Sequence, residues 1–93
     1  MGFQKVGVVG AGQMGNGIAQ VVAAKGISVV MMDIQQESLD TGMKTITSSC
    51  DRLIKKEKMN LEEKTALLEN ISTTTSLEDL SPCDFVVEAA TEN

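Results

Sequence analysis

Hydrophobic residues occur along the chain in short continuous runs and, between them, at helical spacing. Residues 6–9 and 27–32 are continuously or almost continuously apolar and partly β-branched, which is typical of strands buried on both faces of a parallel sheet. Between these runs an apolar stripe begins at Met14 and recurs at intervals of three and four residues, as on one side of a helix that ends at Gly26. The pattern therefore predicts a βαβ unit at the start of the chain.

A helical hairpin is predicted after the second strand. Residues 35–59 carry apolar side chains at helical spacing and several lysines near their end, which predicts a long amphipathic helix with Gly42 as its candidate breaking point. Asn60 is followed three residues later by Glu63, a spacing that resembles a capping box. We therefore expect a second, shorter helix that runs through Leu68.

Two more strands are predicted in the last part of the chain. Residues 71–75 are rich in β-branched side chains, and residues 85–90 begin with three apolar ones and are expected to be buried on both faces. Between these strands, Ser76 and Asp79 are expected to cap one helical turn, which Pro82 ends. The whole chain then alternates strands with helices.

This alternation predicts an α/β fold, a Rossmann-type parallel sheet wound with right-handed crossovers. Of the strand order 3-2-1-4-5-6 found in dinucleotide-binding domains, strands 1 to 4 are present, with the helical hairpin between strands 2 and 3. The fourth strand would form an apolar edge, which is an aggregation hazard in an isolated domain. We therefore expect residues 1–93 to be the N-terminal portion of a dinucleotide-binding domain from a longer protein.

A glycine-rich segment lies between the first strand and the first helix. Its six residues match the pattern G-x-G-x-x-G and are the candidate phosphate-binding residues: Gly10, Ala11, Gly12, Gln13, Met14 and Gly15. In this pattern the first glycine permits the tight turn, the second lets a pyrophosphate approach the backbone, and the third lets the helix pack closely on the strand. The N–H groups at the helix start favour an anion. The alternative is a tight βα turn without a ligand.

Asp33 ends the second predicted strand, about twenty residues after the glycine pattern. At this position a carboxylate accepts hydrogen bonds from the hydroxyls of an adenosine ribose. Its charge would repel a 2′-phosphate, and the residues that follow, 34–36, include no Arg or Lys. The sequence therefore favours NAD over NADP, with a helix-capping role for Asp33 as the alternative.

Composition narrows the classes of partner. The net charge of −5 disfavours nucleic acids and anionic membrane surfaces. The longest apolar runs fall far short of the ~20 residues that span a bilayer.

The start of the sequence has neither a secretory nor a myristoylation pattern, so we expect a cytoplasmic protein. Cys50 and Cys83 form no C-x-x-C pair and the chain has no His. We therefore predict reduced thiols and no metal site.

Three segments carry a resemblance to a known family. They are residues 10–20 with the sequence GAGQMGNGIAQ, the pair Asp33 and Ile34, and residues 86–93 with the sequence VVEAATEN. In this order, and with the hairpin after the second strand, they resemble the N-terminal NAD-binding domain of 3-hydroxyacyl-CoA dehydrogenases, and the bacterial 3-hydroxybutyryl-CoA branch is nearest. The resemblance implies NAD as cofactor and Glu92 as one of its contacts.

The end of the fourth strand is the other side of the expected cofactor site. In a doubly wound sheet the ligand lies beyond the carboxyl ends of the strands next to the switch point. Here these ends are the glycine pattern and residues 89–93. Ala89 and Ala90 are therefore further candidate cofactor contacts.

The resemblance also implies an activity. The family interconverts L-3-hydroxyacyl-CoA and 3-oxoacyl-CoA with NAD, here with 3-hydroxybutyryl-CoA as the nearest case, in fatty-acid or butyrate metabolism. Its proton-handling His and Glu, with a Ser and an Asn, come from positions beyond residue 93, as does the helical C-terminal domain that forms a homodimer. We therefore assign no catalytic residue and expect the 93-residue chain to be inactive alone. The alternatives are a non-catalytic NAD-binding fragment and the NAD-binding domain of another hydroxyacid dehydrogenase.

A basic cluster lies at the end of the long predicted helix. It consists of Arg52, Lys55, Lys56 and Lys58. In the family this hairpin supplies a Ser and a Lys to the phosphate-bearing coenzyme A moiety of the acyl-CoA substrate, and Ser49 and Lys56 match those positions on one helix face. The alternative is that these lysines stay solvated and complement the helix dipole.

Overall fold

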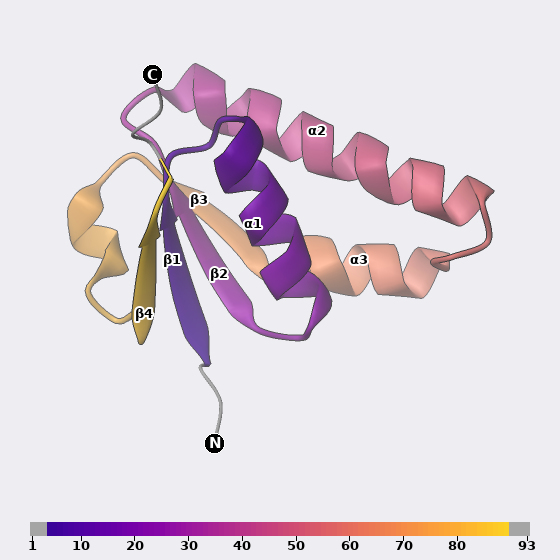
Figure 1. Ribbon diagram of the computed structural model, residues 1–93. Helices are drawn as coiled ribbons and strands as arrows, with labels where there is room; N and C mark the ends of the chain where they lie inside the picture. Colours follow the sequence, from indigo (N-terminus) through magenta and orange to yellow (C-terminus); the bar gives the residue numbers. More distant parts are fainter. Residues whose placement is uncertain (1–3, 90–93) are drawn as a thin grey trace.

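A single parallel sheet organises the chain in the computed structural model, which describes residues 4–89. The elements are β1 (Lys5–Val9), α1 (Gln13–Ala24), β2 (Ser28–Met32), α2 (Gln36–Lys55), α3 (Leu61–Glu69), β3 (Ile71–Thr74), the 3-10 helix η1 (Leu77–Leu80) and β4 (Phe85–Glu88). The strands lie in the order β3-β2-β1-β4 and all neighbours pair in parallel (Figure 1). This arrangement confirms the predicted α/β, Rossmann-type fold and the crossover from β3 to β4.

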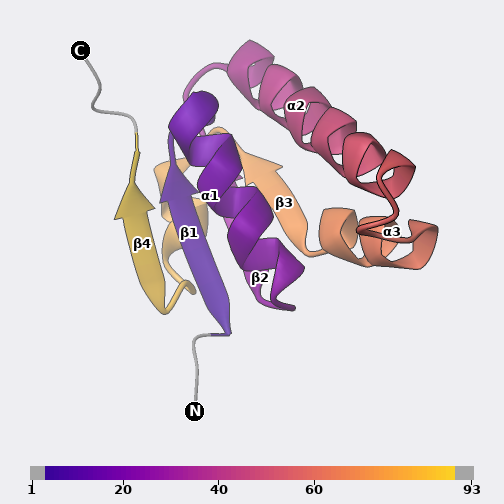
Figure 2. The same cartoon turned by 45° about the vertical axis from the view of Figure 1, so that its right-hand side comes forward.

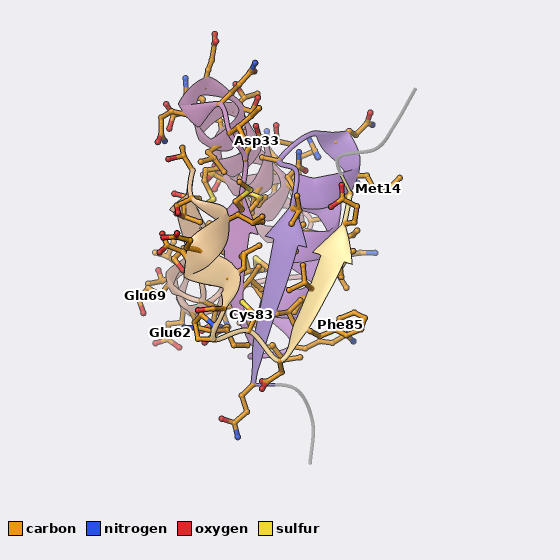
Figure 3. All side chains as sticks on the ribbon, turned by 90° about the vertical axis from the view of Figure 1, so that its left-hand side faces the viewer. Met14, Asp33, Glu62, Glu69, Cys83 and Phe85 are labelled. Carbon is orange, nitrogen blue, oxygen red and sulfur yellow. The ribbon has the colours of Figure 1, made fainter. Side chains whose placement is uncertain are left out.

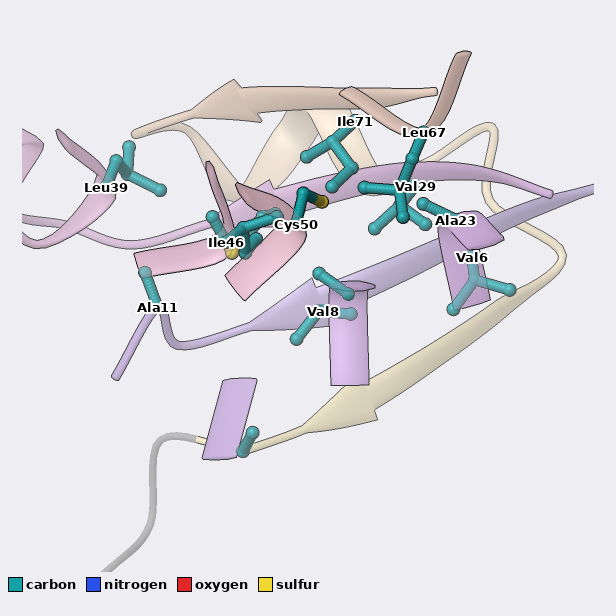
Figure 4. Packing of buried hydrophobic residues seen from close by; sticks show 13 residues of the cluster. Val6, Val8, Ala11, Ala23, Val29, Leu39, Ile46, Cys50, Leu67 and Ile71 are labelled. Atoms are coloured by element: carbon teal, nitrogen blue, oxygen red, sulfur yellow. The ribbon is translucent and has the colours of Figure 1, made fainter. Parts of the chain in front are cut away.

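Apolar side chains fill both faces of the central strands because successive strand residues point to opposite sides. On β1, Val6 and Val8 pack under the three α-helices, whereas Val9 joins a smaller cluster with Leu80 of η1. The helical side holds the larger core, and Figure 4 shows Ile46 and Cys50 of α2 packed against the strands. This core fixes α1 and α2 over the sheet.

The stripe predicted for α1 is partly wrong. Met14 and Val21 are 57% and 58% exposed, and the helix instead buries Ala19 and Ala23 against the sheet. Small side chains let the helix axis come closer to the strands. Ile18 and Val22 of the predicted stripe still pack against the core, whereas Met14 and Val21 lie on the exposed flank. The periodicity therefore located the helix and half of its buried face.

The long helix α2 is continuous through Gly42, so the expected break is absent. A Cβ atom at this position would lie 2.9 Å from the Ala11 carbonyl oxygen. The glycine therefore lets α2 approach the loop after β1. The helix ends at Lys55, four residues earlier than expected, because Lys56 caps it and Glu57 adopts a φ of 60°.

The hairpin of α2 and α3 projects beyond the sheet (Figure 2). The predicted capping box is confirmed, since the Asn60 side chain accepts from the Glu63 N–H at 2.7 Å and the Asn60 N–H donates to Glu63 Oε1 at 2.9 Å. Lys64 on α3 also forms a salt bridge of 2.7 Å with Asp51 on α2. These contacts set the turn between the two helices.

The turn before β4 is stabilised differently from the prediction. Ser76 occupies the N-cap position of η1 but its side chain makes no capping hydrogen bond. Instead the Thr74 hydroxyl donates to the Asp79 carboxylate and accepts from the Ser76 N–H at 3.1 Å. Threonine at the end of β3 thus replaces serine as the residue that organises the turn.

Strand β4 forms one edge of the sheet, as expected, but it is exposed on both faces. Phe85 and Val86 are 50% and 45% exposed. The predicted burial of this strand is therefore wrong for the described residues 4–89, in which β4 pairs only with β1 and no helix covers it. Figure 3 shows Phe85 on the same side of the sheet as Met14. Within the part of the chain that the structure describes, no helix has the length and apolar character needed to cross a membrane.

Candidate cofactor-binding site

The carboxyl ends of three strands meet at one edge of the sheet. The Gly10 N–H donates to the Met32 carbonyl at 2.6 Å, and the Ala89 N–H donates to the Val9 carbonyl at 2.8 Å. These bonds hold the loop after β1 next to the ends of β2 and β4. Four candidate residues, Gly10, Ala11, Asp33 and Ala89, are therefore brought to the same edge.

The turn after β1 depends on two of the glycines. Gly10 has a φ of 105°, a conformation that L side chains rarely adopt. A Cβ atom at Gly15 would lie 1.8 Å from the Gly10 carbonyl oxygen. The chain can therefore turn sharply at Gly10 and start α1 in direct contact with that turn.

The start of α1 presents backbone donors at this edge. Gly12 is its N-cap and offers no side-chain cap, and the first intrahelical bond runs from the Asn16 N–H to the Gly12 carbonyl at 2.9 Å. The N–H groups of Gln13, Met14 and Gly15 therefore have no acceptor within the helix. Such a helix start favours an anion through these donors and through the helix dipole.

Asn16 is a site residue that sequence reasoning missed. It is buried, and its Nδ2 donates to the Gly12 carbonyl at 2.8 Å. This bond holds the second glycine of the pattern against the first turn of α1. The sequence signal for this role was a polar residue among the small residues Gly15, Ala19 and Ala23, which form the buried face of α1.

Asp33 connects β2 to the glycine turn. Its Oδ2 accepts from the Ala11 N–H at 2.9 Å, and its Oδ1 accepts from the Gln35 N–H at 3.0 Å. Each carboxylate oxygen has a further lone pair for a ligand hydroxyl. The capping alternative is wrong, because the N-cap of α2 is Gln35.

A shallow cleft of about 310 Å³ opens beside Asp33. Its lining residues are Val9, Gly10, Met32, Asp33, Ile34, Leu77 and Glu88. None of these residues is a Lys or an Arg, so the cleft offers no cation to a 2′-phosphate. Sequence reasoning missed Leu77 as a lining residue, because only the crossover from β3 to β4 brings η1 to this edge.

The other candidate residues of this site differ in exposure. Ala11 and Ala89 are buried, and their N–H groups already donate to the Asp33 carboxylate and to the Val9 carbonyl. Gln13 and Met14 are exposed at the start of α1, and Figure 3 shows Met14 and Asp33 at the same end of the sheet. Ala90 and Glu92 lie outside the described residues.

The second candidate site lies on α2, away from the cleft. Ser49 is half-buried and its hydroxyl oxygen accepts from Gln20 Nε2 on α1 at 2.9 Å. Lys56 is exposed at the C-cap of α2. The two residues are separated by seven positions, or two helical turns, and so face the same side. Sequence reasoning missed Gln20, because no local pattern shows which residue of α2 its side-chain amide will contact.

The two cysteines are unpaired. Burial raises the pKa of the Cys50 thiol and that of the Cys83 thiol, so both are neutral near pH 7. Residues 4–89 contain no group of three or more His, Cys, Asp or Glu that could hold a metal ion.

The parallel sheet, the glycine turn and the carboxylate after β2 define a dinucleotide-binding domain of the Rossmann type. The family model described as 3-hydroxyacyl-CoA dehydrogenase, NAD binding domain, matches residues 5–93. The chain belongs to this family, and NAD is its cofactor.

Relatives agree with this membership. A 3-hydroxybutyryl-CoA dehydrogenase of Bradyrhizobium diazoefficiens is 46% identical over 90 residues, which is 97% of this chain and 31% of that protein. A probable 3-hydroxybutyryl-CoA dehydrogenase of Deinococcus radiodurans is 49% identical over 89 residues, or 96% of this chain and 32% of that protein. The crystal structure of an (S)-3-hydroxybutyryl-CoA dehydrogenase from Ralstonia eutropha superposes with a TM-score of 0.95 at 51% identity, covering 99% of this chain and 32% of that one. The chain thus spans about a third of the length of these relatives.

Proposed function

We propose that residues 1–93 form the N-terminal portion of the NAD-binding domain of an oxidoreductase that interconverts L-3-hydroxyacyl-CoA and 3-oxoacyl-CoA. The main support is the hydrogen bond between the Asp33 carboxylate and the Ala11 N–H. This bond lies beside the start of α1, which has no side-chain cap, in a chain that belongs to this family. The names of the relatives favour 3-hydroxybutyryl-CoA as the substrate.

The metabolic setting is part of the same proposal. A fatty acid oxidation complex subunit alpha of Colwellia psychrerythraea is 38% identical over 89 residues, which are 96% of this chain and 12% of that protein. This similarity supports a role in fatty-acid metabolism, and the 3-hydroxybutyryl-CoA relatives support one in butyrate metabolism. The proposal places the protein in the cytoplasm.

Each part of the candidate site has a role in binding NAD. The donors at the start of α1 hold the pyrophosphate, with Gly12 allowing its approach. Asp33 accepts from the adenosine ribose, and Ile34 and Leu77 supply apolar surface beside it. Ala89 completes the site at the end of β4, and Ala90 and Glu92, which lie outside the described residues, are proposed as further contacts. Bound NAD supplies the hydride chemistry, and these residues position it.

The proposal assigns no catalytic residue to residues 1–93. The sequence has no His, which is the residue that most often transfers protons near neutral pH. We propose that the longer parent protein supplies the residues that transfer the proton. Its helical C-terminal domain would form the homodimer. The 93-residue chain alone is therefore expected to bind NAD without turnover.

The test is a fluorescence titration of NADH with the 93-residue chain, followed by an assay of NADH oxidation with acetoacetyl-CoA. We expect saturable NADH binding and no oxidation above the rate without protein. The matched variant Asp33→Ala should weaken binding. Absence of NADH binding by a folded chain would reject the cofactor site, and turnover would reject the assignment of catalysis to other residues.

The second part of the proposal is that Ser49 and Lys56 bind the coenzyme A moiety. Lys56 is exposed near Arg52, Lys55 and Lys58, so this end of α2 is positively charged in an acidic chain. Phosphate groups of coenzyme A match that charge.

A pair of charge-matched variants tests this assignment. Lys56→Ala should weaken binding of coenzyme A and leave NADH binding unchanged. Lys44→Ala removes the same charge from another face of α2 and should change neither constant. Equal affinities for coenzyme A in the wild type and both variants would contradict the proposed site.

A further inference from the structure

The seam between α1 and α2 contains a polar contact next to the proposed coenzyme A site. Gln20 Nε2 donates to Ser49 Oγ at 2.9 Å, in a partly buried position. The two residues come from different helices and are separated by 29 positions in the sequence. The contact therefore belongs to the packing of α1 on α2 and not to the local structure of either helix.

Ser49 differs from two threonines that precede it on α2. The Thr45 hydroxyl donates to the Thr41 carbonyl at 3.0 Å, and the Thr47 hydroxyl donates to the Met43 carbonyl at 2.8 Å. Those protons are used within the helix. The Ser49 hydroxyl oxygen instead accepts a hydrogen bond from Gln20 on the neighbouring helix.

The direction of this bond decides what Ser49 can offer to a ligand. A serine hydroxyl has one proton and two lone pairs. Because Gln20 donates to one lone pair, the proton of Ser49 stays free for an acceptor outside the seam. Phosphate oxygens and amide carbonyls, both present in coenzyme A, are such acceptors.

We propose that Gln20 is a positioning residue that holds the Ser49 hydroxyl as a hydrogen-bond donor toward the coenzyme A moiety. This inference rests on the proposed function, in which Ser49 and Lys56 bind that moiety. Gln20 acts through Ser49 and does not itself touch the ligand. Helix α1 then contributes to both ligands, to NAD by its start and to coenzyme A by a side chain in its second half.

The experiment measures the dissociation constant of coenzyme A for the 93-residue chain by isothermal titration calorimetry, with NADH titrated in parallel. Gln20→Met keeps the length of the side chain and removes its amide. It should weaken coenzyme A binding about 2- to 10-fold, the effect of losing one neutral hydrogen bond, and leave NADH binding unchanged. Gln20→Asn, whose amide is too short to reach Ser49, should give the same result.

Gln20→Glu tests the direction of the bond. A carboxylate accepts from the Ser49 hydroxyl and so consumes the proton that the ligand needs. This variant should weaken coenzyme A binding more than Gln20→Met does. Ser48→Glu places the same charge on the exposed neighbour of Ser49, and its smaller effect measures simple repulsion of the phosphates.

A double-mutant cycle separates positioning from a structural role. In the Ser49→Ala background, Gln20→Met should have no further effect on coenzyme A binding. If Ser49→Ala weakens binding and Gln20→Met does not, or if their effects simply add, the inference is overturned and the proposed site stands. If the wild type binds coenzyme A no better than Ser49→Ala and Lys56→Ala, the proposed site itself is overturned, and the inference with it. Urea unfolding of each variant identifies any loss that comes from the fold.

Discussion

The Asp33 carboxylate and the Ala11 N–H form a hydrogen bond of 2.9 Å that joins the end of β2 to the turn after β1. The second oxygen of the same carboxylate accepts from the Gln35 N–H at 3.0 Å. One side chain therefore orders two backbone segments and still presents lone pairs to the cleft. Asp33 is expected to matter for both stability and cofactor choice.

Asp33→Ala should lower the free energy of unfolding by about 1–3 kcal/mol, because two N–H donors lose their acceptor. Asp33→Asn keeps one acceptor oxygen and removes the charge, so its loss of stability should be smaller. It should also reduce the preference for NADH over NADPH, because the repulsion of the 2′-phosphate is gone. Urea unfolding and fluorescence titrations with both cofactors measure these effects. An unchanged preference in Asp33→Asn would show that Asp33 does not set cofactor choice.

Gly15 and Gly17 form a matched pair within α1. Gly15→Ala would place a Cβ atom 1.8 Å from the Gly10 carbonyl oxygen, whereas a Cβ at Gly17 meets nothing within 4 Å. Gly15→Ala should therefore unfold the turn and abolish NADH binding. Gly17→Ala should raise the free energy of unfolding by about 0.5–1 kcal/mol, since alanine favours a helix interior. Circular dichroism during urea unfolding compares the two, and equal effects would contradict the close contact at Gly15.

The Asn60 capping box of α3 should contribute more to the free energy of unfolding than the Gln35 side chain does at the N-cap of α2. Asn60→Ala removes a side chain that accepts from the Glu63 N–H, at a cost of about 0.5–2 kcal/mol. Gln35 is the N-cap of α2 but makes no side-chain capping bond, so Gln35→Ala should cost little. The denaturant midpoints of the two variants, compared with that of the wild type, measure the two losses of stability. A loss at Gln35 as large as that at Asn60 would argue against the capping box.

The buried Cys50 thiol should make stability fall at high pH. Burial raises its pKa in the folded protein, whereas the unfolded thiol titrates near its ordinary value of about 8.5. Above that value the unfolded chain releases a proton that the folded chain keeps, so rising pH favours unfolding.

The variant Cys50→Ala isolates this effect. Its free energy of unfolding should fall less between pH 8 and pH 10 than that of the wild type. Cys83, whose pKa is also raised by burial, is present in both proteins and cancels in the comparison. Identical pH dependence in the two proteins would show that Cys50 does not contribute.

The fold followed from the sequence because its signals are local. Short apolar runs, helical spacing and the pair Asn60 and Glu63 each involve neighbouring residues, and local patterns predict the type and order of elements well. The glycine pattern and Asp33 were found for the same reason, since their spacing is fixed by one βαβ unit. The sequence by itself thus determined the topology and the cofactor class.

Tertiary packing decided what no local pattern contains. The face of α1 that is buried, the continuity of α2 through Gly42 and the exposure of Phe85 depend on which element lies opposite each residue. The same holds for Leu77 beside the cleft and for Gln20 opposite Ser49, which come from segments far apart in the chain. A sequence pattern specifies which side chains are available along one element, whereas their partners are set by how closely two elements can approach.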